Sequence, residues 1–244
     1  MWQATAYCGL PPVPASLAGR FNPDPILILG LLAISGAHLL WLHRCGKGVA
    51  APLAGWMTVS IALLSPLCAL AVALFSARVA QHMILLIIAA PLVASGLPGG
   101  HGRGLWPAAM SFMIALWLWH MPAPYDATFH STPLYWSMHV TLFGSGVWLW
   151  RELLAHADDD AINALIAGIA TSMQMSLLGA LLTLSGHAWF DVHYLATTAW
   201  GLTPLADQQL GGALMWVPGC ALFFWAALRT MLRVWQATER RMPA

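Results

Sequence analysis

Three histidines are the side chains of this sequence best suited to chemistry: His82, His120 and His139. Each lies near one end of a different apolar segment, and at ~1.5 Å per helical residue His82 and His139 are about 8 Å from the starts of their segments. Similar depth on neighbouring antiparallel helices allows the imidazoles to converge. An imidazole inside a membrane span is costly unless it faces the bundle interior and finds partners, which favours a functional site. The alternative is a set of neutral imidazoles that form hydrogen bonds between helices.

A carboxylate is expected beside these histidines. In the segment that opens the last apolar stretch, Thr203 is suited to the N-cap, Pro204 to the first helical position and Asp207 to the first turn. The same location lets Asp207 bind a metal ion or orient an imidazole, and the structural and functional interpretations can coexist. His187 and His193, in the loop before this helix, are interpreted as solvated side chains.

Sulfur donors give a weaker signal. Neutral imidazole suits copper, zinc and iron, whereas thioether and thiolate select copper(I). Each of the three histidines has a methionine neighbour, but adjacent helical residues diverge by ~100° and cannot both reach one ion. Four cysteines are scattered without a C-x-x-C pair, so the sequence predicts neither a disulfide framework nor a thiolate zinc site: Cys8, Cys45, Cys68 and Cys220. Cys68 and Cys220 are interpreted as small apolar residues.

The elements that must position these residues are membrane-spanning helices. Of 244 residues, 59% are hydrophobic and only 8% are charged, and the mean hydropathy is +0.71. A span needs roughly 20 apolar residues. Seven stretches qualify: about 25–43, 52–74, 77–97, 105–122, 134–151, 161–184 and 208–234. The weakest break lies near Phe75. We therefore expect an all-α polytopic membrane protein with an outward tail (1–24), a seven-helix transmembrane domain (25–235) and a cytoplasmic tail (236–244).

The distribution of basic residues predicts the orientation, because basic loops resist translocation. Only Arg20 and Arg78 fall on one side of the seven spans. The other eight fall on the opposite side: Arg44, Lys47, Arg103, Arg151, Arg229, Arg233, Arg240 and Arg241. The N-terminus should therefore face outward and the C-terminus the cytoplasm. His82, His120 and His139 would then lie near the outer face.

Several function classes are excluded. The formal charge of +1 provides no basic field for nucleic acid. The sequence contains no G-x-S-x-G elbow, no H-E-x-x-H and no glycine-rich phosphate loop, and nothing in it indicates a catalytic nucleophile. We expect a protein that is not an enzyme.

Several short motifs, in their order along the chain, resemble those of the multi-spanning CtaG-type cytochrome c oxidase assembly factor family. The similarity runs from about residue 24 to residue 235. The motifs are Ser65-Pro66-Leu67, 75–83 with 90–92 and 96–98, Trp119-His120-Met121-Pro122 with Tyr125-Asp126, His139, and 205–212 with 215–219.

This resemblance implies a bacterial plasma-membrane protein that is needed to make an active haem-copper oxidase. It further implies that the protein helps copper reach the oxidase from the periplasmic side, with the oxidase subunits as partners. Carried over by position, the candidate metal ligands are His82, His120, His139 and Asp207.

The sequence departs from the family pattern at four positions. Arg78 replaces a histidine one turn before His82, and Cys68 replaces an acidic residue. Tyr135 and Met138 replace a histidine and a glutamate before His139. A cation at Arg78 would oppose a bound metal unless Asp207 or Asp126 offsets it. Either the chain binds metal with fewer ligands, or it acts by contact with the oxidase alone.

Two rival functions stay open. Inward-facing imidazoles of a helical bundle also suit haem iron, as in a b-type membrane cytochrome. The second rival is a metal-free scaffold that packs against oxidase subunits. Small-residue patches such as Gly144-Ser145-Gly146 and Gly211-Gly212 could serve packing within the bundle or with such a partner.

Overall fold

The computed structural model describes residues 6–98 and 104–239, and within these residues all regular structure is helical. Arg103, Arg240 and Arg241, which support the predicted orientation, lie outside the described residues. Short 3-10 helices cover Pro14–Gly19, Asp191–His193 and Thr197–Trp200. The longer helices are α1 (Pro25–Arg44), α2 (Ala50–Leu64), α3 (Leu67–Ala73), α4 (Phe75–Met83), a π-helical segment (Ile84–Ala89), α5 (Ala90–Ala94), α6 (Leu105–Trp119), α7 (Pro122–His130), α8 (Thr132–Asp159), α9 (Ala161–Leu184) and α10 (Pro204–Glu239).

The seven apolar stretches correspond to helices or to runs of consecutive helices. By length and composition, three candidates can cross a membrane among the described residues: α1, the run Phe75–Ala94 and α9. A fourth results if α2 and α3, bent by 48° at their junction, are counted as one span. An all-helical protein with several apolar helices is therefore confirmed, and the count of seven spans stays a prediction.

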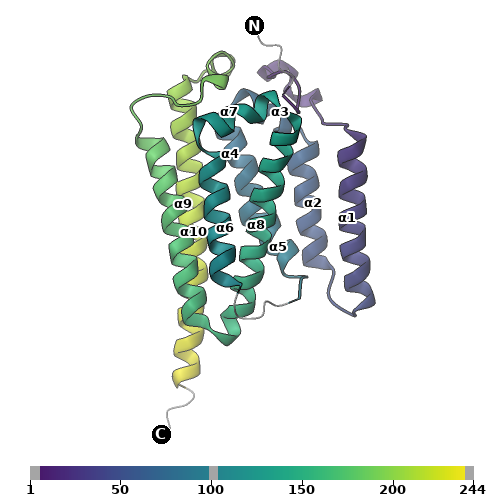
Figure 1. The fold of residues 1–244 in the computed structure, drawn as a ribbon, viewed down its shortest axis with the longest axis vertical. Coiled ribbons are helices and arrows are strands. Elements are labelled where there is room, and N and C mark those ends of the chain that lie inside the picture. The colour runs from purple at the N-terminus through teal and green to yellow at the C-terminus, as the bar shows by residue number, and fades with distance from the viewer. Residues whose placement is uncertain (1–5, 99–103, 240–244) are drawn as a thin grey trace.

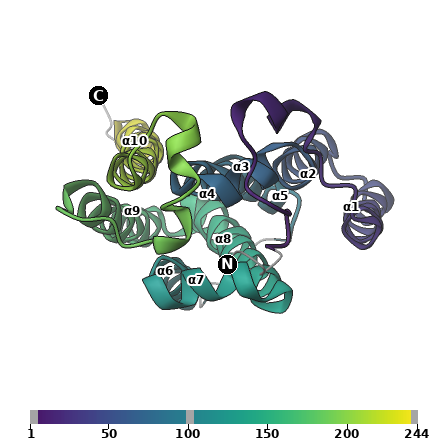
Figure 2. The same ribbon diagram turned by 90° about the horizontal axis from the view of Figure 1, so that it is seen from above.

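The helices stand side by side with α4 and α8 near the middle (Figures 1 and 2). α9 and α10 form a close pair on one side, and α1 stands at the opposite edge beyond α2. The N-terminal segment, α3 and α7 lie at the end of the bundle shown at the top of Figure 1, and α10 ends at the other. The core between α4, α6 and α8 is therefore enclosed by other helices, whereas α1 is mostly uncovered.

The run from α2 to α5 is interrupted twice. Ser65-Pro66 separates α2 from α3, and Leu74, with extended backbone at φ −126° and ψ 132°, separates α3 from α4. The first N–H groups of a helix have no acceptor within it, so the start of α4 needs one from elsewhere. His82 is the second-last residue of α4, and the π-helical segment begins two residues later, at Ile84. Such π-helical insertions are frequent at functional sites.

The N-terminal segment is fastened to the bundle and is not a free tail. A disulfide joins Cys8 to Cys68 at the start of α3. The Tyr7 hydroxyl donates a hydrogen bond to Asp24, which also accepts from Ile26 N at 2.9 Å as the N-cap of α1. The hydrogen bond from Tyr7 is the main reason why the pKa of the Asp24 carboxyl is lowered. Burial is the main reason why the pKa of the Tyr7 hydroxyl is raised. The sequence predicts no disulfide framework, and this is wrong for Cys8 and Cys68, because cysteines 60 positions apart form no local pattern.

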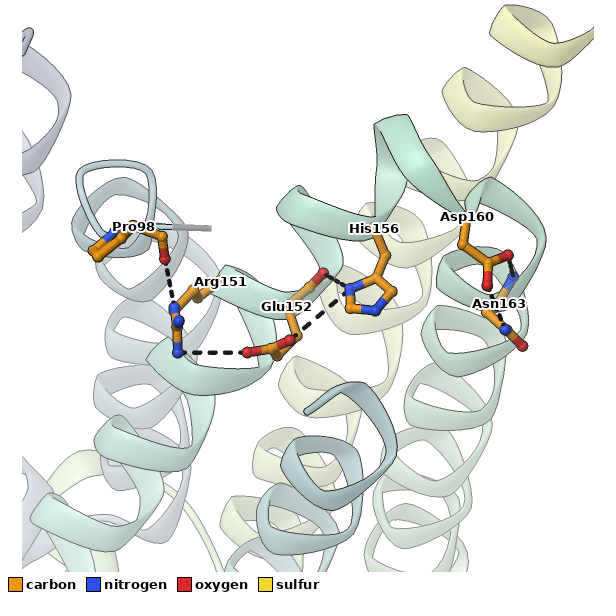
Figure 3. A network of polar contacts seen from close by, with 6 residues as sticks. All are labelled: Pro98, Arg151, Glu152, His156, Asp160 and Asn163. Atoms are coloured by element: carbon orange, nitrogen blue, oxygen red, sulfur yellow. Dashed lines mark hydrogen bonds and ion pairs between the residues drawn. The ribbon is translucent and has the colours of Figure 1, made fainter. Parts of the chain in front are cut away.

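A polar network lies at the other end of α8 (Figure 3). Arg151 Nε donates to the Pro98 carbonyl at 2.6 Å, and Arg151 Nη1 lies 3.5 Å from the buried Glu152 carboxylate. The His156 ring lies 3.9 Å from the same carboxylate and shares a hydrogen bond of 2.8 Å with the Glu152 carbonyl. These contacts tie the segment after α5 to α8, far along α8 from His139.

Candidate metal centre

The structure brings the three predicted histidines together in the interior of the bundle. His82 comes from α4, His120 follows the last residue of α6, and His139 lies in the second turn of α8. The His82 ring centroid lies 5.4 Å from that of His139 and 5.9 Å from that of His120. All three side chains are buried, with relative exposures of 2 to 4%. His82 is the common neighbour of the other two.

Hydrogen bonds fix the tautomers of two of these rings. His120 Nδ1 is 2.7 Å from the Leu116 carbonyl, and His139 Nδ1 is 3.0 Å from the Tyr135 carbonyl. A carbonyl oxygen can only accept, so each Nδ1 carries the hydrogen and each Nε2 keeps a lone pair. This is the arrangement in which metal-binding histidines are usually held.

Three other ring nitrogens of the cluster are buried and yet have no hydrogen-bond partner among the described residues. They are His139 Nε2 and both nitrogens of His82. Leaving such a group unsatisfied costs about 1 to 3 kcal/mol. Three unpartnered nitrogens in one cluster therefore indicate a place where a ligand supplies the missing interaction.

The cluster fits a metal ion in donor type. Two imidazoles that bind one ion through bonds of ~2.0 Å have ring centroids about 5 to 6 Å apart, which matches both spacings from His82. As the rings lie, no group of three or more His, Cys, Asp or Glu side chains in residues 6–98 and 104–239 is arranged to hold an ion. A three-nitrogen site therefore requires these rings to turn about their side-chain torsions.

Asp207, on α10, makes its hydrogen bonds at the start of α4. Its Oδ2 accepts from Phe75 N at 2.7 Å, and its Oδ1 accepts from Ser76 N at 3.1 Å and from the Ser76 hydroxyl. It is fully buried and lies in the first turn of α10, as predicted. Asp207 therefore supplies the acceptor that the break at Leu74 removes from α4. It acts on the helix that carries His82, two turns before that residue.

Arg78 is a buried cation held by aromatic rings. Its Nε donates to the Ala71 carbonyl at 3.2 Å and its Nη1 to Thr128 Oγ1 at 3.1 Å. The guanidinium lies 4.2 Å from the Phe129 ring centroid, with Tyr125 and Tyr135 also within 6 Å. Such cation–π contacts stabilise a desolvated charge.

The two carboxylates that could offset the charge of Arg78, those of Asp207 and Asp126, bind other groups. Within the described part of the chain Arg78 makes no ion pair, because Asp207 caps α4 and Asp126 pairs with His130 at 3.4 Å. Neither carboxylate therefore meets the condition, stated from the sequence, under which the charge of Arg78 would not oppose a bound metal ion. The positive charge one turn from His82 is left to act on the cluster.

Two tyrosines, Tyr135 and Tyr7, pack in succession on the His139 side of the cluster. The Tyr135 ring packs against His139 at a tilt of 36°, with ring centroids 4.3 Å apart, and Tyr7 stacks on Tyr135 at 4.8 Å. The sequence identifies Tyr135 only as a lost donor, although its position four residues before His139 was a signal that its carbonyl could hold that ring. Tyr7 gave no comparable signal. An apolar cavity of about 500 Å³, bordered by α1, α2 and α8, reaches His139 from the α1 side.

His193 is buried, which corrects its interpretation as a solvated loop residue. It lies in the loop between α9 and α10, where its Nε2 is 2.7 Å from the Tyr125 hydroxyl and its ring packs against Phe129. His187 is exposed, as predicted. Burial, assisted by the charge of Arg78, lowers the pKa of His193 from 6.5 to about 3.

His193 should make the fold sensitive to acid. The unfolded chain takes up a proton near pH 6.5 and the folded chain does not, so stability is full above that pH and falls as pH drops toward 3. At pH 5 the loss from this residue should be about 2 kcal/mol. Thermal unfolding in detergent at pH 7.5 and pH 5 measures it, and His193→Gln should have a smaller difference between the two pH values. The exposed His187→Gln is the control, and an equal pH effect in all three proteins would contradict this origin.

Comparison with known proteins agrees with the motifs. The sequence matches the family described as cytochrome c oxidase caa3 assembly factor (Caa3_CtaG) over residues 46–110 and 103–237. No curated protein and no solved structure matches the chain. The two matched ranges cover α2 to α10 almost completely and include His82, His120, His139 and Asp207. The chain therefore belongs to the cytochrome c oxidase caa3 assembly factor family.

Proposed function

We propose that this protein helps to build a haem-copper cytochrome c oxidase by holding copper in the cluster of His82, His120 and His139. It catalyses no reaction, and oxidase subunits are its partners. The observation that carries the proposal is the set of buried ring nitrogens without partners at the meeting point of α4, α6 and α8. Copper bound there would supply a Lewis-acidic cation to lone pairs that the bundle leaves unused.

The division of roles follows from the contacts. His82, His120 and His139 are the proposed ligands. The Leu116 and Tyr135 carbonyls orient two of the rings, and Asp207 fixes the start of α4. Asp207 is therefore proposed as a residue that positions His82 and not as a ligand.

The charge of Arg78 favours copper(I) over copper(II). Repulsion between the guanidinium and a bound ion scales with the charge of the ion, so it is about twice as large for the divalent ion. Uncharged imidazoles do not offset this repulsion as carboxylates would. A singly charged soft ion with a low coordination number also suits a cluster that offers few ligands.

The proposed placement is a bacterial plasma membrane crossed seven times. Under this proposal the N-terminal segment and α7 face the periplasm, because Arg44, Lys47 and Arg151 belong to the opposite end of the bundle. The histidine cluster then lies just beneath the periplasmic face, on the side from which copper would reach an oxidase.

Copper content tests the ligand assignment. Detergent-purified protein loaded anaerobically with Cu(I) should retain about one tightly held ion, and His82→Ala should weaken binding at least about tenfold. The exposed His187→Ala should bind as wild type does. Element analysis after dialysis against a Cu(I) chelator gives the ratio, and size-exclusion chromatography verifies folding. Equal copper in all three proteins would contradict the assignment.

The same preparations separate the rival functions. A Soret band in stoichiometric amount would favour haem between the histidines, because haem absorbs there and copper-imidazole centres do not. Oxidase activity in cells that carry His82→Ala distinguishes a metal site from a scaffold. Full activity with that variant would support contact with the oxidase alone.

A further inference from the structure

A second polar site lies at the N-terminal end of the bundle, outside the histidine cluster. A cavity of about 350 Å³ opens between the N-terminal segment and the start of α3. The Cys8–Cys68 disulfide forms part of its wall. Among the other residues that line it are Tyr7, Arg20 and Asn22. The disulfide therefore borders a space that a small thiol or an ion could enter.

The two sulfurs differ in access and in surroundings. Cys8 is half-buried, whereas Cys68 has a relative exposure of 1%. Asn22 Nδ2 lies 3.8 Å from Cys68 Sγ, and the cation of Arg20 borders the same cavity. An N–H donor and a nearby positive charge stabilise a thiolate more than a thiol or a disulfide sulfur. The surroundings therefore suit a pair that also exists in the reduced state.

One aromatic residue separates this pair from the histidines. The Tyr135 hydroxyl lies 3.5 Å from Cys8 Sγ and 3.7 Å from Cys68 Sγ. The ring of the same tyrosine packs against the His139 ring, with centroids 4.3 Å apart. The sulfurs thus lie on the side of Tyr135 that faces the cavity, and the imidazoles lie on its inner side.

We propose that Cys8 and Cys68 are a thiol–disulfide pair whose reduced form binds one Cu(I) ion at the entrance to the histidine cluster. The entrance role rests on the proposed function, whereas the redox-dependent binding does not. Two thiolates are the ligands that Cu(I) prefers. With metal–sulfur bonds of ~2.3 Å, two bound sulfurs lie about 4 to 5 Å apart, a separation that Cα atoms 5.6 Å apart allow.

The redox step needs two equivalents of a thiol reductant. The first thiolate attacks the more accessible sulfur of Cys8, the S–S bond breaks, and the electron pair remains on Cys68 near Asn22. A second thiolate attacks the mixed disulfide and releases Cys8, so that the two reductants leave as one disulfide. Two electrons and two protons pass to the cysteine pair. Binding of Cu(I) then releases the two protons without further electron transfer.

Reduction should leave the sulfurs close together. The N-terminal segment is also held to the bundle by the hydrogen bond from Tyr7 to Asp24 and by that from Asn22 N to the Leu64 carbonyl at 2.9 Å. Within the segment, Arg20 donates to the Leu10 carbonyl at 2.7 Å. These bonds do not depend on the disulfide. The pair can therefore open chemically while the cavity keeps its walls.

Copper stoichiometry in two redox states tests the proposal. The full-length protein with Cys45→Ser and Cys220→Ser provides a background in which only the pair can respond. Competition with a chromogenic Cu(I) chelator should find about one more bound ion in the dithiothreitol-reduced background than in its oxidised form. Adding Cys8→Ser should remove this difference. Equal copper in both redox states of the background would overturn the proposal.

Two further measurements test the redox state of the cysteines and separate the two copper ions. Reduction of the folded background, removal of the reductant and then unfolding in the presence of maleimide should add two labels. The same treatment without reduction should add none. Labelling follows unfolding because Cys68 is too buried to be labelled in the folded protein. No labels after reduction, or two without it, would overturn the redox pair. His82→Ala in the same background should keep the redox-dependent ion and lose the other one. If the background binds no ion that depends on reduction, the present proposal fails, and if it binds no ion that depends on His82, the proposed function fails.

Discussion

Replacing Asp207 with alanine should lower the free energy of unfolding by about 3 kcal/mol. The carboxylate is fully buried and accepts hydrogen bonds from Phe75 N, Ser76 N and the Ser76 hydroxyl. Alanine would leave the two backbone donors at the start of α4 without partners, and water cannot easily reach them. A cap supplied by another helix also holds α4 against α10, so the loss should exceed that of an ordinary N-cap, which is about 1 kcal/mol.

Two variants control this prediction. Asp207→Asn keeps the shape and one acceptor oxygen but turns an amide NH₂ toward backbone donors, so its loss should be intermediate. Asp191→Ala removes an exposed acid from the first turn of a 3-10 helix and should stay within about 0.5 kcal/mol of wild type. Chemical unfolding in detergent, followed by circular dichroism, measures all three. Equal stability of the Asp207→Ala and Asp191→Ala proteins would contradict the capping role.

Much of the histidine cluster could be predicted from the sequence because it depends on local spacing. His82 and His139 lie about equally deep in their apolar stretches, and His120 lies at the end of its own. The helical rise fixes how deep each residue lies along its helix axis. Residue counts therefore predict that these histidines lie at a similar depth in the bundle. Their lateral separation depends on which helices are neighbours, and the resemblance to a known family gave these histidines as candidate ligands without giving neighbours or distances.

Asp207 shows where such reasoning stops. Its place in the first turn of α10 could be predicted from Thr203 and Pro204. Its partners could not, because they belong to a helix start about 130 residues earlier in the chain. The break near Phe75 was visible in the sequence, but nothing local shows which side chain supplies the missing acceptor. A carboxylate that suggested a metal ligand therefore proves to cap a helix.

The same limit applies to Cys8 and Arg78. A disulfide forms when the fold brings two sulfurs together, and single cysteines far apart in the sequence give no pattern. The sequence named Asp207 and Asp126 as carboxylates that could offset the charge of Arg78, and buried charges are usually paired. Instead, the aromatic rings of α7 and α8 surround it. In both cases the decisive contacts come from segments distant in the sequence.

Replacing Gly212 with valine should have the largest effect on folding. A Cβ at Gly212 would lie 2.6 Å from the Gly179 carbonyl oxygen and 2.7 Å from Thr183 N, both backbone atoms of α9. Backbone atoms cannot turn aside, so α9 and α10 would have to separate along their whole contact. Small residues allow helices in a membrane to approach this closely, and this close packing is a main source of their stability.

We expect Gly212→Val to lower the free energy of unfolding by more than about 3 kcal/mol, or to prevent purification of folded protein. Gly168→Val, on α9, is the matched control, because a Cβ there would meet no atom within 4 Å. Yield of monodisperse protein and its unfolding in detergent measure both variants. Because α10 also carries Asp207, separation of the two helices would release the cap on α4 and displace His82. Gly212→Val should therefore also lose Cu(I) at the histidine cluster, whereas a folded variant with wild-type copper would contradict the close packing described here.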